Sequence, residues 1–514
     1  MSTPLSVHNW NSGIPARILR ALGSGLRHPT TVACLMGFIL CCLKATAASI
    51  DQDPTLARLK PEISVDSSLP VRSHRLSLTQ SVDIALRNFP SLREAQARLG
   101  QRDYGITLQK TAYLPQLNLL VQELRTTTNV VSGAIFPQTL DVIPMQTGKE
   151  THSSSFNSVW ADNLGANFSW ELYDFGLRHA NVLTARAQRN SAFANLQLTQ
   201  LDVADGAAMA YLQAVAAKAT IAAQAATVRR MEAWQLVVHT LVDRGLRPGV
   251  DTARSDADLA ESRIKLIDAQ RDTELAEVDL AEALGEAGGE IDVIDDPWMR
   301  KPTVFFTAPP LEVANHPLAI LRSNEVLTAH AEVHSWERTW YPHLWWHSGI
   351  WGRGSGTPGD ARTTAGGVVP QTGNWVAGLS MSFAVFDYFS VKAQKHEAVR
   401  NEQAERANYD LAVQILMQKD ARARVLLDKS RKIVVETEYL LTSAQENEKK
   451  ALERYRVGLS NIVEVAEAEE ILERAELANA MAEVRVWQAI LAIGYAQGDL
   501  KPFLQLAHLA EGTI

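Results

Sequence analysis

The chain has 514 residues, of which 46% are hydrophobic, 7% aromatic and 21% charged; this composition is typical of a folded protein and excludes disordered and fibrous ones. Its 50 basic and 58 acidic residues give a formal net charge of −8, which argues against a nucleic-acid partner. After residue 48 no apolar run is long enough for a membrane-spanning helix, so soluble proteins and β-barrels remain.

Residues 1–48 have the pattern of a secretory signal peptide. Three arginines precede a twelve-residue apolar run at 32–43, and the small residues 45–47 form a cleavage site. Twelve apolar residues are too few to span a bilayer, which disfavours a membrane anchor. All three cysteines lie inside this run, so we expect no disulfide and no thiolate metal site in the exported chain. Residues 49–77 are expected to be an N-terminal linker.

The rest of the chain carries an internal repeat. Equivalent residues recur at two fixed offsets, 227 and 213 positions: Pro90 and Pro317, Pro115 and Pro342, Asp174 and Asp387, Gly245 and Gly458. Chance does not supply so many pairs at so few offsets, so the chain is internally duplicated. We predict a first structural repeat at residues 78–292, a second at 305–495, and a C-terminal tail at 496–514.

Each repeat is predicted to contain the same elements in the same order. After a helical segment, which Pro90 interrupts in the first repeat, we expect strands at about 116–125 and 163–172 and helices at 177–244 and 251–284. The second repeat gives strands at about 343–352 and 375–386 and helices at 391–457 and 461–493. The segment 391–457 contains neither glycine nor proline, and as a helix it would be about 100 Å long. Such helices must pack side by side in a coiled-coil-like array.

The strand segments alternate between apolar residues and small or polar ones, most regularly in 163–172 and 375–386. A half-buried sheet of a soluble protein shows the same alternation as a lipid-facing barrel strand of about ten residues. Seven of the twelve tryptophans lie in or beside these segments, which is typical of the aromatic girdles of membrane barrels. Four strands cannot close a barrel, so a membrane version must combine several chains.

Short motifs accompany these elements, and their ordered set occurs twice. Asn-x-Pro-x-Leu stands at 88–92, Tyr-Leu-Pro-Gln-Leu at 113–117, Tyr-Asp-Phe-Gly at 173–176, and Gly-Leu at both helical hairpin tips. Together they resemble the TolC-type outer-membrane efflux proteins of Gram-negative bacteria, from about residue 76 to residue 500.

The resemblance implies an α+β membrane protein with a long coiled-coil tunnel in the periplasm. Each chain of a homotrimer would contribute four strands to one twelve-stranded transmembrane β-barrel in contact with outer-membrane lipid. It also implies a passive exit duct for efflux or type I secretion, which works with a periplasmic adaptor and an inner-membrane transporter and needs no cofactor. The cargo is left open.

The resemblance further assigns roles to particular residues. Glu464 and Glu467 fall on the acids of the channel entrance, and Asp251 and Tyr455 fall on a latch between hairpins. Adaptor docking would use the hairpin tips: Arg244, Gly245, Leu246, Arg456, Val457, Gly458 and Leu459. The sequence departs from the family in having glutamates where the best-known members have aspartates in the entrance. It also has Ser460 in place of an arginine of the latch, and about 126–159 between the first two strands is a long loop.

Ordinary structural roles are open for the same residues. Asn461 would be an N-cap with Glu464 at the N3 position, Asp251 would stabilise a helix start, and the tip glycines would end two helices. A soluble periplasmic coiled-coil scaffold is the alternative function. No nucleophile elbow or phosphate-binding motif is present, so we predict no enzyme activity and no catalytic, cofactor-binding or metal-binding residue.

Overall fold

The computed structural model describes residues 74–127, 158–289, 291–294, 298, 306, 308–355, 370 and 372–511. The expected signal peptide, nearly all of the N-terminal linker and most of the long loop between the first two strands lie outside these residues. The chain divides into two units, residues 1–70 and Val71–Ile514, and every described residue belongs to the second unit.

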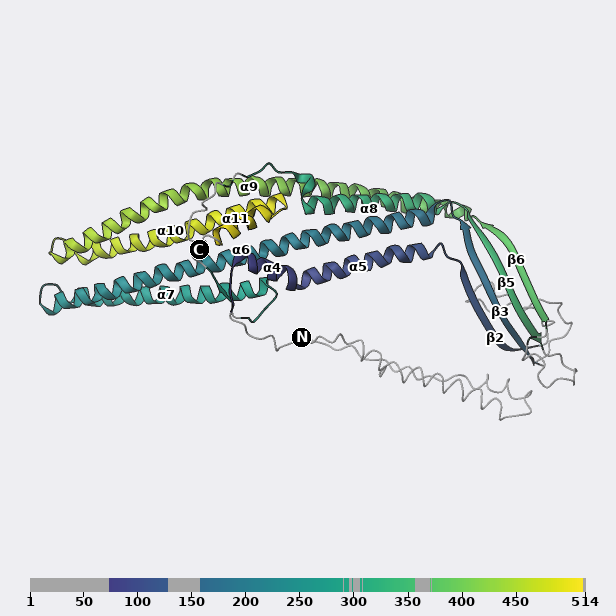
Figure 1. Ribbon diagram of the computed structural model, residues 1–514, viewed down its shortest axis with the longest axis horizontal. Helices are drawn as coiled ribbons and strands as arrows, with labels where there is room; N and C mark the ends of the chain where they lie inside the picture. Colours follow the sequence, from purple (N-terminus) through teal and green to yellow (C-terminus); the bar gives the residue numbers. More distant parts are fainter. Residues whose placement is uncertain are drawn as a thin grey trace, which may run out of the picture. The chain divides into compact units, whose positions relative to one another are not determined.

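Two helices of 67 and 69 residues run the length of the helical region: α6 (Leu177–Asp243) and α9 (Tyr388–Arg456) (Figure 1). At its far end each turns back into a shorter helix, α7 (Val250–Ala283) and α10 (Ile462–Gln497) respectively. The other half of each long helix is flanked by the remaining segments, α4 (Leu78–Asn88), α5 (Pro90–Thr111) and α8 (Pro317–Thr339). None of the helices in the described ranges has both the length and the apolarity of a membrane span.

The helices form one layer in which α6 and α9 keep their places along its length, while the shorter helices beside them change. Near the hairpin tips the order of packing is α7–α6–α10–α9, and toward the sheet it is α5–α6–α8–α9 (Figure 1). The layer therefore has two open edges within the described chain, α7 and α5 on one side and α9 on the other. The two hairpins meet through α6 and α10.

Small side chains allow these long helices to approach one another. Ala207, Ala208 and Ala214 of α6 are fully buried, and the core around them is filled by Tyr211 and Trp487. Because alanine also has the highest helix propensity, the same residues favour both the helix and its close packing.

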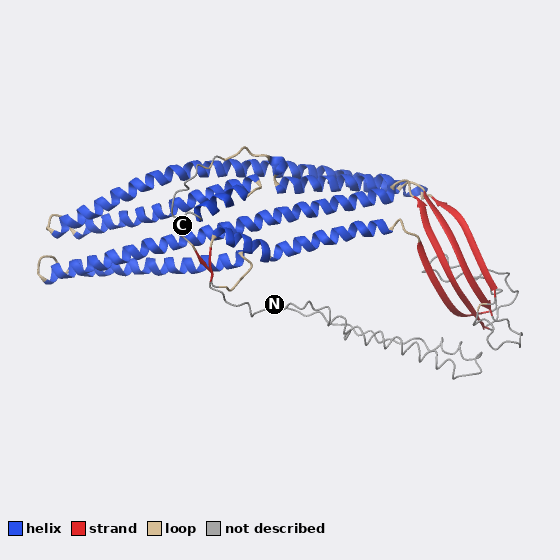
Figure 2. Cartoon of the chain, viewed as in Figure 1, coloured by secondary structure: helices blue, strands red, loops and turns tan. Residues whose placement is uncertain are grey.

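Four strands form an antiparallel sheet in the order β2-β3-β5-β6: β2 (Gln116–Thr127), β3 (Ser158–Tyr173), β5 (His343–Ser355) and β6 (Thr372–Ser382) (Figure 2). Each repeat supplies one hairpin, and β3 pairs with β5 to join them. A Cβ atom on Gly165 would lie 2.7 Å from the Cβ of Trp351, so glycine permits this close pairing. Within the described residues, β2 and β6 have no strand on their outer sides.

Several boundaries differ from the sequence-based expectations. The strand expected to end at residue 386 ends at Ser382, because β5 begins at His343 and residues after Ser382 have no partner strand. Val385–Asp387 forms a short 3-10 helix, η3, and α9 begins directly afterwards at Tyr388. Helix α10 continues past residue 493 to Gln497, where Gly498 takes a left-handed φ of +78°.

Two elements were not expected at all. A short strand in the linker, β1 (His74–Leu76), pairs in parallel with β4 (Ile291–Val293). The expected C-terminal tail contains the helix α11 (Lys501–Glu511). The Glu511 carboxylate accepts hydrogen bonds from the Leu78 backbone N–H (2.7 Å) and the Thr79 hydroxyl (2.8 Å). The C-terminal helix therefore caps the first turn of α4.

Candidate functional site

Each helical hairpin turns at a glycine with a left-handed backbone. Gly245 has a φ of +71° and Gly458 a φ of +81°. The N–H groups of the following residues, Leu246 and Leu459, donate to carbonyls five residues earlier at 2.9 and 2.8 Å. These are the hydrogen bonds of a Schellman motif, which satisfies the last carbonyls of a helix. The ordinary structural role of both glycines is thus present.

The tips expose apolar and basic side chains together. Leu246, Val457 and Leu459 are each about 70% exposed, at 66%, 70% and 71%, and Arg244 and Arg456 are exposed beside them. Exposed leucines at the end of a hairpin are a feature that a partner protein can bury.

The structure brings the two expected latch residues into contact. Tyr455, at the end of α9, is fully buried, and its Oη donates a hydrogen bond to Oδ2 of Asp251 at 3.0 Å. Asp251 lies in the first turn of α7 and is 7% exposed. Burial, together with the hydrogen bond and charge of Asp251, raises the pKa of Tyr455 to about 12, so the phenol remains a donor at neutral pH.

Two further residues hold Tyr455, and sequence reasoning missed both. The guanidinium of Arg247 lies 4.1 Å from the Tyr455 ring centroid and donates to the backbone carbonyls of Tyr455 (2.5 Å) and Ser460 (3.2 Å). The ring of Trp234 packs edge-on against Tyr455 at 4.7 Å. The resemblance led us to expect an arginine at position 460, which is a serine here; the guanidinium on Tyr455 comes from Arg247 of the opposite hairpin. The only sequence signal was its place directly after a tip.

Glu464 and Glu467 lie on one face at the start of α10. Asn461 accepts a hydrogen bond from the backbone N–H of Glu464 at 3.0 Å, so the expected N-cap is present. The Glu464 carboxylate lies 3.5 Å from Arg454 of its own hairpin and is partly exposed, while Glu467 is exposed. Val465 next to them is buried. Both carboxylates thus point away from the core of their own chain, and their place in a ring stays a prediction.

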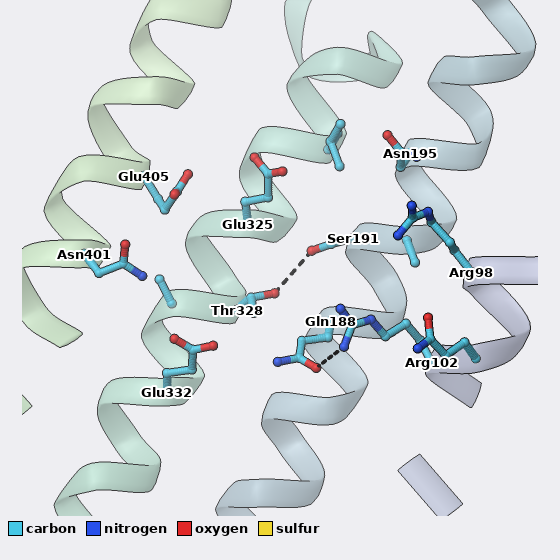
Figure 3. A pocket seen from close by; sticks show the side chains of 14 residues that line it. Arg98, Arg102, Gln188, Ser191, Asn195, Glu325, Thr328, Glu332, Asn401 and Glu405 are labelled. Carbon is cyan, nitrogen blue, oxygen red and sulfur yellow. Dashed lines mark hydrogen bonds between the residues drawn. The ribbon is translucent and has the colours of Figure 1, made fainter. Parts of the chain in front are cut away.

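A polar groove of about 500 Å³ lies between α5, α6, α8 and α9, farther from the tips (Figure 3). Arg98 and Arg102 line it from α5, and Glu325 and Glu332 line it from α8. Arg102 donates to Gln188 of α6 at 3.0 Å. The mostly polar lining lacks the apolar surface of a typical small-molecule site, and none of the expected site residues lies in it.

One face of the four-stranded sheet is largely apolar from edge to edge. The cross-strand register places these side chains together on it: Leu117, Leu119, Val121, Leu164, Ala166, Phe168, Trp170, Trp346, Ile350, Trp375, Ala377, Leu379 and Met381. Leu119 and Trp375 are each 77% exposed. The opposite face carries mainly polar or small residues, such as Asn118, Asn167 and Ser380.

Tryptophans stand near both ends of this apolar face on β3. Trp160 lies beneath the guanidinium of Arg125 at 5.1 Å, and Trp170 donates to the carbonyl of Tyr113 at 3.0 Å. Asp162 lies between Trp160 and Leu164 on the same face and is the polar residue at this end of the apolar surface. Ten residues separate the two tryptophans, a strand length of roughly 33 Å. At the usual tilt of a barrel strand this spans about 25 Å, the height of the apolar band of outer-membrane barrels.

Long helical hairpins that continue into a sheet with one apolar and one polar face define a protein of the outer-membrane channel class. A family model described as outer membrane efflux protein matches residues 82–286 and 353–498, more than half of the chain. The chain belongs to the outer membrane efflux protein family. This finding confirms the resemblance seen in the sequence and places the protein in the outer membrane with its helical part in the periplasm.

Solved structures show the same fold. The outer-membrane channel OprN is 23% identical, with a TM-score of 0.67 over 82% of this chain and 89% of that one. VceC from Vibrio cholerae is 18% identical, with a TM-score of 0.65 over 82% and 96%. The open state of the MtrE channel from Neisseria gonorrhoeae is 18% identical, with a TM-score of 0.64 over 82% and 89%. No curated protein matches the sequence.

Proposed function

We propose that three copies of the chain form one channel, with a twelve-stranded transmembrane β-barrel and a periplasmic tunnel of helices. The channel is a passive exit duct for efflux or secretion. An inner-membrane transporter supplies the energy, and a periplasmic adaptor docks on the hairpin tips.

The exposed apolar face of the sheet is the observation that carries this proposal. A soluble protein rarely leaves such a continuous apolar surface in water, whereas a membrane barrel needs it on its lipid side. The polar face of the same strands would then line the lumen. Phe168 and Leu379, on the apolar face, would contact lipid.

The open edges of the chain support closure into a ring. One side of the chain has β2, α5 and α7 at its edge, and the other side has β6 and α9. An interface between unlike edges joins copies head to tail and generates a closed ring when the rotation fits. Two copies would supply eight strands and three would supply twelve; the family resemblance favours three.

Matching apolar stripes on the two edges support the same assembly. Four exposed apolar residues follow one face of α7: Ile264, Ile267, Leu275 and Val278. Exposed apolar residues also follow α9 between 411 and 440: Leu411, Met417, Val425, Leu426, Ile433, Val435, Tyr439 and Leu440. Counted from the tips, the α7 stripe covers residues 14 to 28 and the α9 stripe covers residues 16 to 45. The two stripes therefore overlap about 24–42 Å from the tips, the condition for one to cover the other in a neighbouring copy.

The tip region supplies the gate in this proposal. Adaptor binding at the exposed tip residues would loosen the contacts of Tyr455 with Asp251 and Arg247, and the hairpins would then separate. Glu464 and Glu467 from three chains would place up to six carboxylates around the entrance. Such a ring attracts cations and repels anions.

Single-channel conductance of the purified mature protein in planar bilayers tests the proposal. A closed duct with an acidic entrance gives a small, cation-preferring conductance that changes as carboxylates protonate. Mass determination in detergent should give three chains per particle. Protein that stays soluble without detergent and never inserts would reject the channel in favour of the periplasmic scaffold.

A further inference from the structure

A partly buried group of charged side chains joins the two helical hairpins farther from the tips than the Tyr455 contact. Arg230 of α6 lies 3.3 Å from Oε2 of Glu469 on α10, and its Nη1 and Nη2 each donate to the carboxylate of Glu476 at 2.9 Å. Glu469 is 7% exposed. Arg230 stands four residues before Trp234, so the group lies about 6 Å farther from the tips than the ring that packs on Tyr455.

All four helices of the two hairpins contribute to this group. On α7, Lys265 lies 3.0 Å from a carboxylate oxygen of Glu473, whose other oxygen accepts from Gln224 of α6 at 3.2 Å. The Glu448 carboxyl of α9 lies close enough to Glu469 to raise its pKa. Lys265 also lies 3.2 Å from Glu261 of its own helix. Together with the Arg230 contacts, the group contains five carboxyls and two cations. The surplus of acid favours retention of a proton within it.

We propose that Arg230, Glu469 and Glu476 form a second lock, which keeps the two hairpins of one chain together in the closed channel and weakens as the pH rises. This inference rests on the proposed channel function. The hairpins meet through α6 and α10, and the lock bridges these two helices. Parting them would break the ion pairs and charge-assisted hydrogen bonds of Arg230, which are stronger than hydrogen bonds between neutral groups. Arg230 is thus a positioning residue for the gate.

The direction of the pH effect follows from Glu469. Burial, with the charge and hydrogen bond of Glu448, raises the pKa of Glu469 from 4.5 to about 7 against the opposing effect of Arg230. Opening would hydrate the group and return its pKa toward 4.5. The closed state therefore holds the proton more tightly than the open state. The resulting stabilisation of the closed state is complete below about pH 4.5 and is lost as the pH rises to about 7. Within that window the opening equilibrium of one protomer rises at most about tenfold per pH unit.

The test is the open probability of the full mature channel in planar bilayers between pH 5 and pH 8. Arg230→Met should open the channel at least about tenfold more often, because it leaves the buried Glu469 and the partly buried Glu476 without their cation in the closed state. Glu469→Gln should keep the channel closed. It should also remove the part of the rise in open probability between pH 5 and pH 7 that the titration of Glu469 causes. Arg263→Met is the matched control: its ion pair with Glu232 (2.8 Å) is exposed and joins α6 to α7 within one hairpin.

The outcomes separate this inference from the channel proposal. A wild-type protein that forms no channel would reject both. A conducting wild type whose opening is the same in Arg230→Met and Arg263→Met would overturn the lock alone. If Arg230→Met fails to insert, Glu469→Gln decides, and a wild-type pH profile in that variant overturns the lock. A closed channel restored by Arg230→Lys supports it.

Discussion

Replacing Tyr455 with phenylalanine isolates the hydrogen bond that joins the two hairpins at the tip. The variant keeps the ring packing on Trp234 and the guanidinium contact of Arg247, and it removes only the Oη–Asp251 bond of 3.0 Å. A hydrogen bond to a charged acceptor contributes about 1.5–3 kcal/mol. The opening equilibrium of each protomer should therefore rise about 10- to 100-fold, and by the product of three such factors if the protomers act independently.

Open probability in planar bilayers measures this change, with detergent-resistant trimer as the check on assembly. Tyr104→Phe is the matched control, because Tyr104 lies on α5 outside both apolar stripes and is 79% exposed. We expect the Tyr455 variant to conduct more and to assemble normally. Equal open probability in the two variants would show that this hydrogen bond does not hold the closed state.

Three further substitutions test the remaining assignments. Replacing Glu464 and Glu467 together with alanine should widen the entrance and reduce its preference for cations. The helix cap is kept, because Asn461 accepts from the backbone N–H of residue 464. Unchanged ion selectivity would contradict the assignment of both acids to the entrance ring. Gly458→Val should destabilise the turn by roughly 1–2 kcal/mol or more, because valine must adopt a left-handed φ there. It should impair adaptor-dependent export without preventing membrane insertion. Normal export would argue against docking at that tip. Leu379→Lys should block membrane assembly, because a charge on the lipid face costs about 2–4 kcal/mol per chain. Ser380→Lys, on the opposite face, should assemble normally. Equal assembly of the two variants would contradict the assigned lipid face.

The sequence by itself determined the order of the elements and the class of the protein. Strand and helix identity are local properties: a two-residue alternation marks strands and a long run without glycine or proline marks a helix. The internal duplication supported these assignments, because each element has an equivalent in the other repeat with the same pattern. Tyr455 and Asp251 could be paired before the structure was known only because the family resemblance placed them at equivalent hairpin positions.

Tertiary structure alone decided which distant side chains meet. Arg247 reaches Tyr455 across 208 positions and Arg230 reaches Glu469 across 239, and neither pair lies within one helix or one turn. The cap that Glu511 provides for α4 spans 433 positions. Such contacts depend on how two hairpins cross and on which turn of each helix faces the other. A shift of one residue rotates a helical side chain by about 100° and removes the contact, so no local pattern in the sequence can encode it.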